Sequence, residues 1–178
     1  VYLFFAVFFI VGVSIYKDYG ISWDENIERD NGIISLNYVN RVLGTNLDDI
    51  QLERHKYSTQ LDSWRDRNYP VGFNFPLAFL SSVLNLNDEQ DIYYLRHLLT
   101  FIIFFGGVVA VYKLVERRND SWKAGLLAAT ILILSPRIFA ESFYNSKDLV
   151  LLAFFAITTN TTVSFLLRPS LKTVLLHA

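Results

Sequence analysis

The chain has 178 residues and a net charge of -1, which argues against a nucleic-acid-binding protein because such proteins carry a strongly basic surface. It has no cysteine, which excludes disulfide frameworks and thiolate metal sites. Its histidines are scattered without the spacing of a metal site: His55, His97 and His177. Hydrophobic residues make up 52% of the chain and gather in blocks, several of which approach the roughly 20 residues that span a bilayer core.

The first apolar block, residues 1–16, predicts a first membrane span. It is apolar from the first residue, with neither an initiator methionine nor a basic segment before it. The sequence therefore does not resemble an intact signal peptide, and we expect a fragment of a longer protein that is entered partway through a membrane helix.

A long polar segment, residues 17–92, follows as the predicted external loop. Apolar residues at helical spacing predict an amphipathic surface helix over about 26–43, with Gly44 as its stop. A second surface helix is predicted over about 76–86, in an apolar stretch that Pro76 interrupts. A true span there is the alternative, but it would move the basic turns downstream to the outer face.

Three further spans are predicted over 93–116, 121–137 and 149–167, with an external turn at 138–148 and the start of a next segment at 168–178. Basic residues cluster after the second and fourth spans: Lys113, Arg117, Arg118, Lys123, Arg168 and Lys172. The positive-inside rule makes these ends cytoplasmic and the long loop external. The prediction is an all-α fold, a single polytopic transmembrane bundle in an integral, multi-pass membrane protein.

Two adjacent carboxylates, Asp24 and Glu25, follow the first span and are candidates to accept a proton from a hydroxyl nucleophile at the membrane surface. The structural alternative is a helix start. Ser22 would cap the surface helix, Glu25 would complete a capping box, and Asp24 would favour the helix dipole. The two interpretations are compatible, because a capped helix start also holds a carboxylate rigidly.

The second candidate site is the outer turn, which combines two cations, two carboxylates and an amide: Arg137, Glu141, Asn145, Lys147 and Asp148. Ordinary polarity at helix ends is the alternative, with Asn145 or Ser146 capping the last span. Ionisable groups at membrane depth are costly, which favours a functional site. Arg96, at the outer start of the second span, can pair with a phosphate through two hydrogen bonds or can extend to the interface as an end residue.

Together these residues resemble the GT-C superfamily of polytopic glycosyltransferases, close to the bacterial protein O-mannosyltransferases and aminoarabinose transferases (family 39-like). The features that carry the resemblance are Asp24-Glu25 after the first span, surface helices before a span that begins Tyr94-Leu95-Arg96-His97, and the segment from Ser135 to Asp148. The resemblance covers essentially the whole chain, but only about the N-terminal third of a typical member.

The resemblance implies transfer of a sugar from a polyprenyl-phosphate carrier to an acceptor hydroxyl on the external face, with the acceptor a lipid, glycan or protein. It implies Asp24 as general base with Glu25 as the second candidate, and Asp148 completing an acidic pocket. Substrate-binding roles fall to Arg96, Arg137, Lys147, Asn145 and Glu141. A divalent cation is permitted, not demanded. The expected location is a bacterial inner or plasma membrane, in contact with membrane lipids.

Two other classes of protein are alternatives. A transporter or channel segment would use Asp148, Lys147 and Asn160 as a polar pathway, which predicts charges inside the spans. A membrane scaffold would use the long loop to bind a partner, which leaves the two external acidic sites unexplained. The charges gather outside the predicted spans, which favours the glycosyltransferase.

Overall fold

The computed structural model describes residues 1–44, 61–167 and 169, and every regular element in these ranges is a helix. The α-helices are α1 (Tyr2–Ile15), α2 (Glu25–Leu43), α3 (Asn74–Val83), α4 (Glu89–Asn119), α5 (Trp122–Leu134), α6 (Pro136–Tyr144) and α7 (Asp148–Leu167). The predicted all-α fold is confirmed for these residues. The predicted segment 168–178, with Arg168 and Lys172, lies almost wholly outside them.

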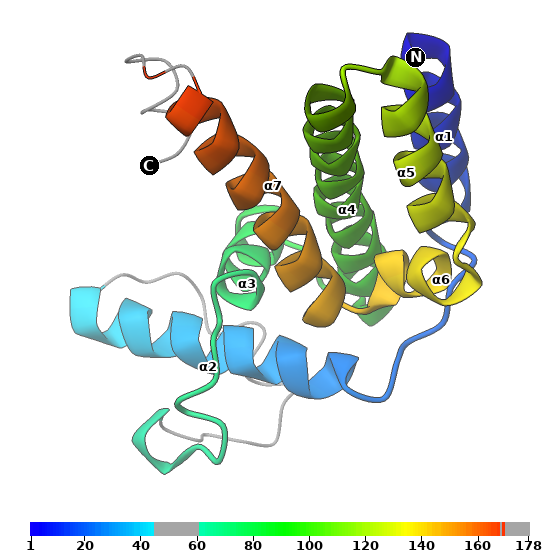
Figure 1. Cartoon of the computed structure of the whole chain (residues 1–178). Helices are drawn as coiled ribbons and strands as arrows, with labels where there is room; N and C mark the ends of the chain where they lie inside the picture. Colours follow the sequence, from blue (N-terminus) through cyan, green and yellow to red (C-terminus); the bar gives the residue numbers. More distant parts are fainter. Residues whose placement is uncertain (45–60, 168, 170–178) are drawn as a thin grey trace.

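The helices form a bundle, and α2 lies across one end of it, which is called the capped end below (Figure 1). Helices α1, α4 and α5 lie side by side, and α7 packs against α4. Helix α2 crosses the end of the bundle at which α4 and α7 begin, and α3 packs against α2. The starts of α2, α4 and α7 and the whole of α6 therefore come together at this one end.

Helices α4 and α7 are long and apolar enough to cross a membrane. Helices α5 and α6 are long and apolar enough to cross a membrane only when they are taken together, and the pair is bent by 71°. Helix α1 has 14 residues and therefore rises about 21 Å, short of the roughly 30 Å of a bilayer core. The described residues thus contain two helices of spanning length, or three if the bent pair is one span.

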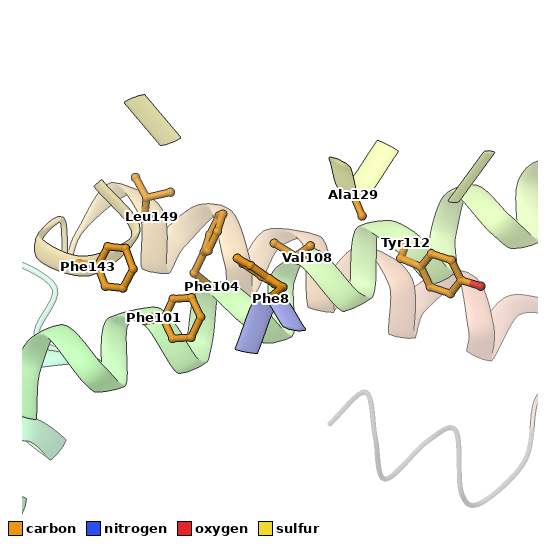
Figure 2. Packing of buried hydrophobic residues seen from close by; sticks show 8 residues of the cluster. All are labelled: Phe8, Phe101, Phe104, Val108, Tyr112, Ala129, Phe143 and Leu149. Atoms are coloured by element: carbon orange, nitrogen blue, oxygen red, sulfur yellow. The ribbon is translucent and has the colours of Figure 1, made fainter. Parts of the chain in front are cut away.

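The main core lies between α4 and its neighbours (Figure 2). Helix α4 contributes Phe101, Phe104, Val108 and Tyr112, spaced three or four residues apart and so on one helix face. The Phe101 ring stacks on Phe143 of α6 with centroids 5.2 Å apart. The same Phe101 ring lies where a side chain on Gly12 of α1 would be, since a Cβ there would meet it at 1.9 Å. This cluster holds α6 across the end of the bundle.

The α2–α3 pair is a separate small core. Helix α2 matches its predicted range, and Gly44 ends it in the left-handed conformation with φ of 63°, as expected. Helix α3 begins at Asn74, two residues earlier than predicted, because Pro76 is tolerated in a first helical turn. The two helices touch at Gly32, where a Cβ would meet the Asn74 carbonyl oxygen at 2.4 Å.

The predicted external turn over 138–148 is wrong in its conformation: most of it is helix α6. Pro136 occupies the first helical position, where its fixed φ and missing N–H are favourable, so it starts a helix instead of ending one. An i,i+4 ion pair between Arg137 and Glu141, 2.7 Å long, supports the helix.

Candidate functional site

A polar cleft of about 160 Å³ lies at the capped end of the bundle. Its lining comes from the start of α2 and from the segment that joins α6 to α7: Ser22, Trp23, Asp24, Glu25, Glu28, Glu141, Tyr144, Asn145, Ser146, Lys147 and Asp148. A larger groove of about 660 Å³ beside α1 has only apolar residues in its lining. Of these two cavities, the smaller one has the groups that acid–base chemistry needs.

Asp24 and Asp148, from segments far apart in the sequence, line this one cleft. Asp24 is exposed at the N-cap position of α2, and its side chain makes no capping hydrogen bond. The predicted capping box is only half formed. The Ser22 N–H donates to Glu25 Oε2 at 3.2 Å, but Asp24, not Ser22, is the N-cap residue. The Asp24 carboxylate is thus accessible to a ligand in the cleft.

Glu25 is placed differently from its neighbour, with 1% of it exposed. Its Oε1 lies 3.1 Å from His97 Nε2 and 3.7 Å from Arg96 Nε, both on α4. The other ring nitrogen of His97 faces the Tyr16 carbonyl at 3.3 Å, and a carbonyl only accepts. The His97 ring therefore bridges the Tyr16 carbonyl and the Glu25 carboxylate. Glu25 lies at the floor of the cleft as one partner in a buried charge cluster.

Arg96 does not line the cleft, whereas a side chain that binds a phosphate there would have to reach it. Its residue is 2% exposed, and its guanidinium donates to Asn74 Oδ1 and to Ser146 Oγ, each at 3.1 Å. Together with Glu25 these partners come from α2, α3 and the segment that joins α6 to α7. Arg96 is a structural link between the walls of the cleft.

The α6–α7 segment holds its polar groups through Asn145. Its Oδ1 accepts from the Asp148 N–H at 2.8 Å, which satisfies the predicted cap at the start of α7. Its Nδ2 donates to Glu141 Oε2 at 3.2 Å and to Asp148 Oδ2 at 3.4 Å. Arg137 is not in the cleft lining: its side chain is 87% exposed and pairs with Glu141.

Lys147 is the cation among the described residues that line the cleft. Its ammonium lies over the Tyr69 ring, 4.8 Å from the centroid. Hydrogen bonding with the Tyr69 side chain raises the pKa of Lys147 above its usual value, so the group stays charged.

Several residues of the site were not predicted from the sequence, among them Glu28, Asn74 and Tyr69. Glu28 lines the cleft one helical turn after Asp24, and this i,i+4 spacing is the signal that could have identified it. Burial raises the pKa of Glu28, although a 2.5 Å hydrogen bond from Asn74 Nδ2 acts in the opposite direction. Asn74 and Tyr69 carry no comparable sequence signal, because their contacts are to residues far away in the chain.

Among residues 1–44, 61–167 and 169, no group of three or more His, Cys, Asp or Glu side chains could hold a metal ion. The divalent cation that the resemblance permits stays a prediction. What the chain's own groups offer is two accessible carboxylates, Asp24 and Asp148, facing one ammonium group.

The fold and the cleft define a class of protein: an all-helical chain with helices of membrane-spanning length and an acidic cleft at one end of their bundle. Comparison with known proteins adds no narrower assignment. No family model, no curated protein and no solved structure matches the chain.

Proposed function

We propose that this protein is a glycosyltransferase of the GT-C type, which moves a sugar from a polyprenyl-phosphate carrier to an acceptor hydroxyl at the external membrane face. The observation that carries the proposal is the meeting of Asp24, Asp148 and Lys147 in one cleft at the end of the bundle. A base, a second acid and a cation are the groups that such a transfer uses.

In the proposed reaction, Asp24 accepts the proton of the acceptor hydroxyl while the hydroxyl oxygen forms a bond to the anomeric carbon of the sugar. The bond from that carbon to the phosphate oxygen breaks, and the polyprenyl phosphate leaves with the electron pair. Asp24 suits the role of base because its side chain is exposed and makes no capping hydrogen bond to the start of α2. Glu25 does not suit it, because its carboxylate is buried against Arg96 and His97.

Lys147 is the group proposed to neutralise the leaving phosphate, on which negative charge develops. This assignment replaces Arg96 and Arg137, neither of which lines the cleft. Asp148, held through Asn145, is proposed to orient the acceptor or the sugar by hydrogen bonds. Glu141 is proposed to act through Asn145, to which it is hydrogen-bonded.

The position of the cleft also supports the proposal. A carrier lipid presents its phosphate at the membrane surface, and the cleft lies where the apolar helices α4 and α7 begin. The basic residues Arg117, Arg118 and Lys123 lie around the opposite end of α4, and under the positive-inside rule this supports an external position for the cleft.

The test is transfer of labelled sugar in membranes that contain the full-length protein, with a panel of polyprenyl-phospho-sugars as donors. Asp24→Asn should lower transfer by roughly a hundredfold or more, because the amide cannot accept the proton. Asp120→Asn is the matched control. It makes the same chemical change at the opposite end of α4, in a left-handed position that asparagine tolerates.

Equal amounts of both variants in the membrane fraction would show that folding and insertion are unaffected. Full transfer by Asp24→Asn would remove Asp24 as the base. Absence of transfer by the unaltered protein with every donor would count against the glycosyltransferase itself.

A further inference from the structure

Lys147 lies in a strongly acidic environment. Asp24, Glu28 and Asp148 line the same cleft, and a lysine side chain is long and flexible enough to fold onto a neighbouring carboxylate. Yet Lys147 forms no ion pair with a carboxylate of the described residues. Its ammonium lies instead over the ring of Tyr69. Some feature of the fold therefore holds this cation apart from the acids around it.

Tyr69 is held firmly enough to be that feature. Its N–H donates to the Asp66 carbonyl at 2.8 Å, in a run of tight turns that begins at a short 3-10 helix, Leu61–Ser63. The run is tied to α2 by a hydrogen bond of 2.6 Å from Trp64 Nε1 to Asn31 Oδ1. Asn31 is itself 2% exposed, so this anchor belongs to the buried side of α2.

We propose that Tyr69 is a positioning residue, whose ring holds the Lys147 ammonium away from the neighbouring carboxylates and ready to bind a phosphate group in the cleft. This inference rests on the proposed function, since the phosphate is that of the polyprenyl-phosphate donor. It also assigns a task to the turns that precede α3.

The contact between the Lys147 ammonium and the Tyr69 ring is weak enough to be exchanged for a phosphate. A cation–π contact at an exposed site is weaker than a charge-assisted hydrogen bond to phosphate. The ammonium can therefore leave the ring for a phosphate oxygen. An ion pair with Asp148 or Asp24 would instead compete with the phosphate and would remove a carboxylate that the proposed reaction needs.

The test measures how well a ligand protects Lys147 from an amine-acylating reagent. The full-length protein is placed in phosphatidylcholine vesicles, and acylation at each lysine is followed by peptide mass spectrometry. The probes are a polyprenyl phosphate and the polyprenol of the same chain length. In the unaltered protein, the phosphate should protect Lys147 and the alcohol should not.

Tyr69→Ala should raise the phosphate concentration needed for half-protection roughly fivefold, because the cation loses its support. Tyr69→Phe keeps the ring but loses the hydroxyl that hydrogen-bonds with Lys147, so its half-protection concentration should lie between those of the unaltered protein and of Tyr69→Ala. Tyr94→Ala is the matched control. It removes a ring 5.0 Å from the Lys17 ammonium, outside the cleft, and should change acylation at Lys17 while leaving protection of Lys147 unchanged.

Unchanged protection of Lys147 in Tyr69→Ala would overturn the inference, as would equal protection by phosphate and alcohol. These results are distinct from failure of the proposed function. Sugar transfer by a protein whose Lys147 stays unprotected would overturn the inference alone. Tyr69-dependent protection without transfer from any donor would support the lysine–tyrosine site and count against the glycosyltransferase.

Discussion

Asp24 and Glu25 are neighbours in the chain but occupy different environments. Asp24 is exposed, whereas Glu25 is buried against two basic side chains of α4. Removing one partner from a buried charge cluster is costly, because the remaining charges lose their counter-ion in a medium that solvates them poorly. Pairs at the surface are worth much less, because water solvates the separated charges almost as well.

Glu25→Gln should therefore lower the free energy of unfolding by about 3 kcal/mol, since the buried Arg96 guanidinium would lose the carboxylate that pairs with it. The measurement is thermal unfolding in detergent micelles, followed by circular dichroism. Glu141→Gln serves as the control, because it makes the same change in a pair whose arginine side chain is 87% exposed. An equal, large loss of stability in both variants would contradict the difference in burial.

At this scale the sequence identified residues that the fold brings together, but not the contacts that each of them makes. Asp24, Glu25, Glu141, Asn145, Lys147 and Asp148 were all predicted, and all line the cleft. Arg96 was predicted as a phosphate ligand, and its partners at positions 74 and 146 show why that could not be corrected from sequence. Whether an arginine faces a ligand or a buried amide depends on contacts between distant segments.

At the scale of helices, close approach depends on small residues. Gly106 and Gly107 are neighbours on α4, and only Gly107 meets the backbone of α7 closely. A Cβ on Gly107 would lie 2.8 Å from Cα and Cβ of Ala153 on α7, whereas a Cβ on Gly106 would lie 3.6 Å from the mobile end of Ile157. The α4–α7 contact, which positions Asp148, is thus set at Gly107.

Gly107→Ala should destabilise the fold by about 1–3 kcal/mol, because α7 must move away from α4. Gly106→Ala should be close to neutral, because alanine favours helix and meets only an ordinary contact. Thermal unfolding of both variants in micelles checks this. Adding Ala153→Gly to Gly107→Ala should restore part of the loss, and a double variant that behaves additively would argue against the contact.

The helix ranges followed from local signals where such signals exist. The period of apolar residues and Gly44 predicted α2 almost to the residue. The predicted third span ran through Pro136 to residue 137, but α5 ends at Leu134 and Pro136 begins α6. The packing of Phe143 on Phe101 then holds α6 across the end of the bundle.

At the scale of the whole molecule, the basic turn and the acidic cleft lie at opposite ends of α4. The positive-inside rule then predicts opposite sides of the membrane for the two ends. The chain contains no cysteine, so single cysteines can report on each end without a background.

Gly20→Cys should react with a membrane-impermeant maleimide in intact cells, because the residue precedes the cleft and a Cβ there meets nothing within 4 Å. Asn119→Cys, at the far end of α4, should react only after the membrane is permeabilised. The measurement is the labelled fraction before and after permeabilisation. Labelling of both positions from the same side would contradict a span by α4.

The contacts of Arg96 also have a consequence for the order in which the protein is built. Its partners at positions 25, 74 and 146 leave the ribosome at widely separated times. Glu25 and Asn74 are already present when Arg96 is made, but Ser146 arrives about fifty residues later. Until then the buried guanidinium lacks one acceptor, and the wall that carries Lys147 and Asp148 is missing. Closure of the cleft therefore waits until the segment between α6 and α7 has been made.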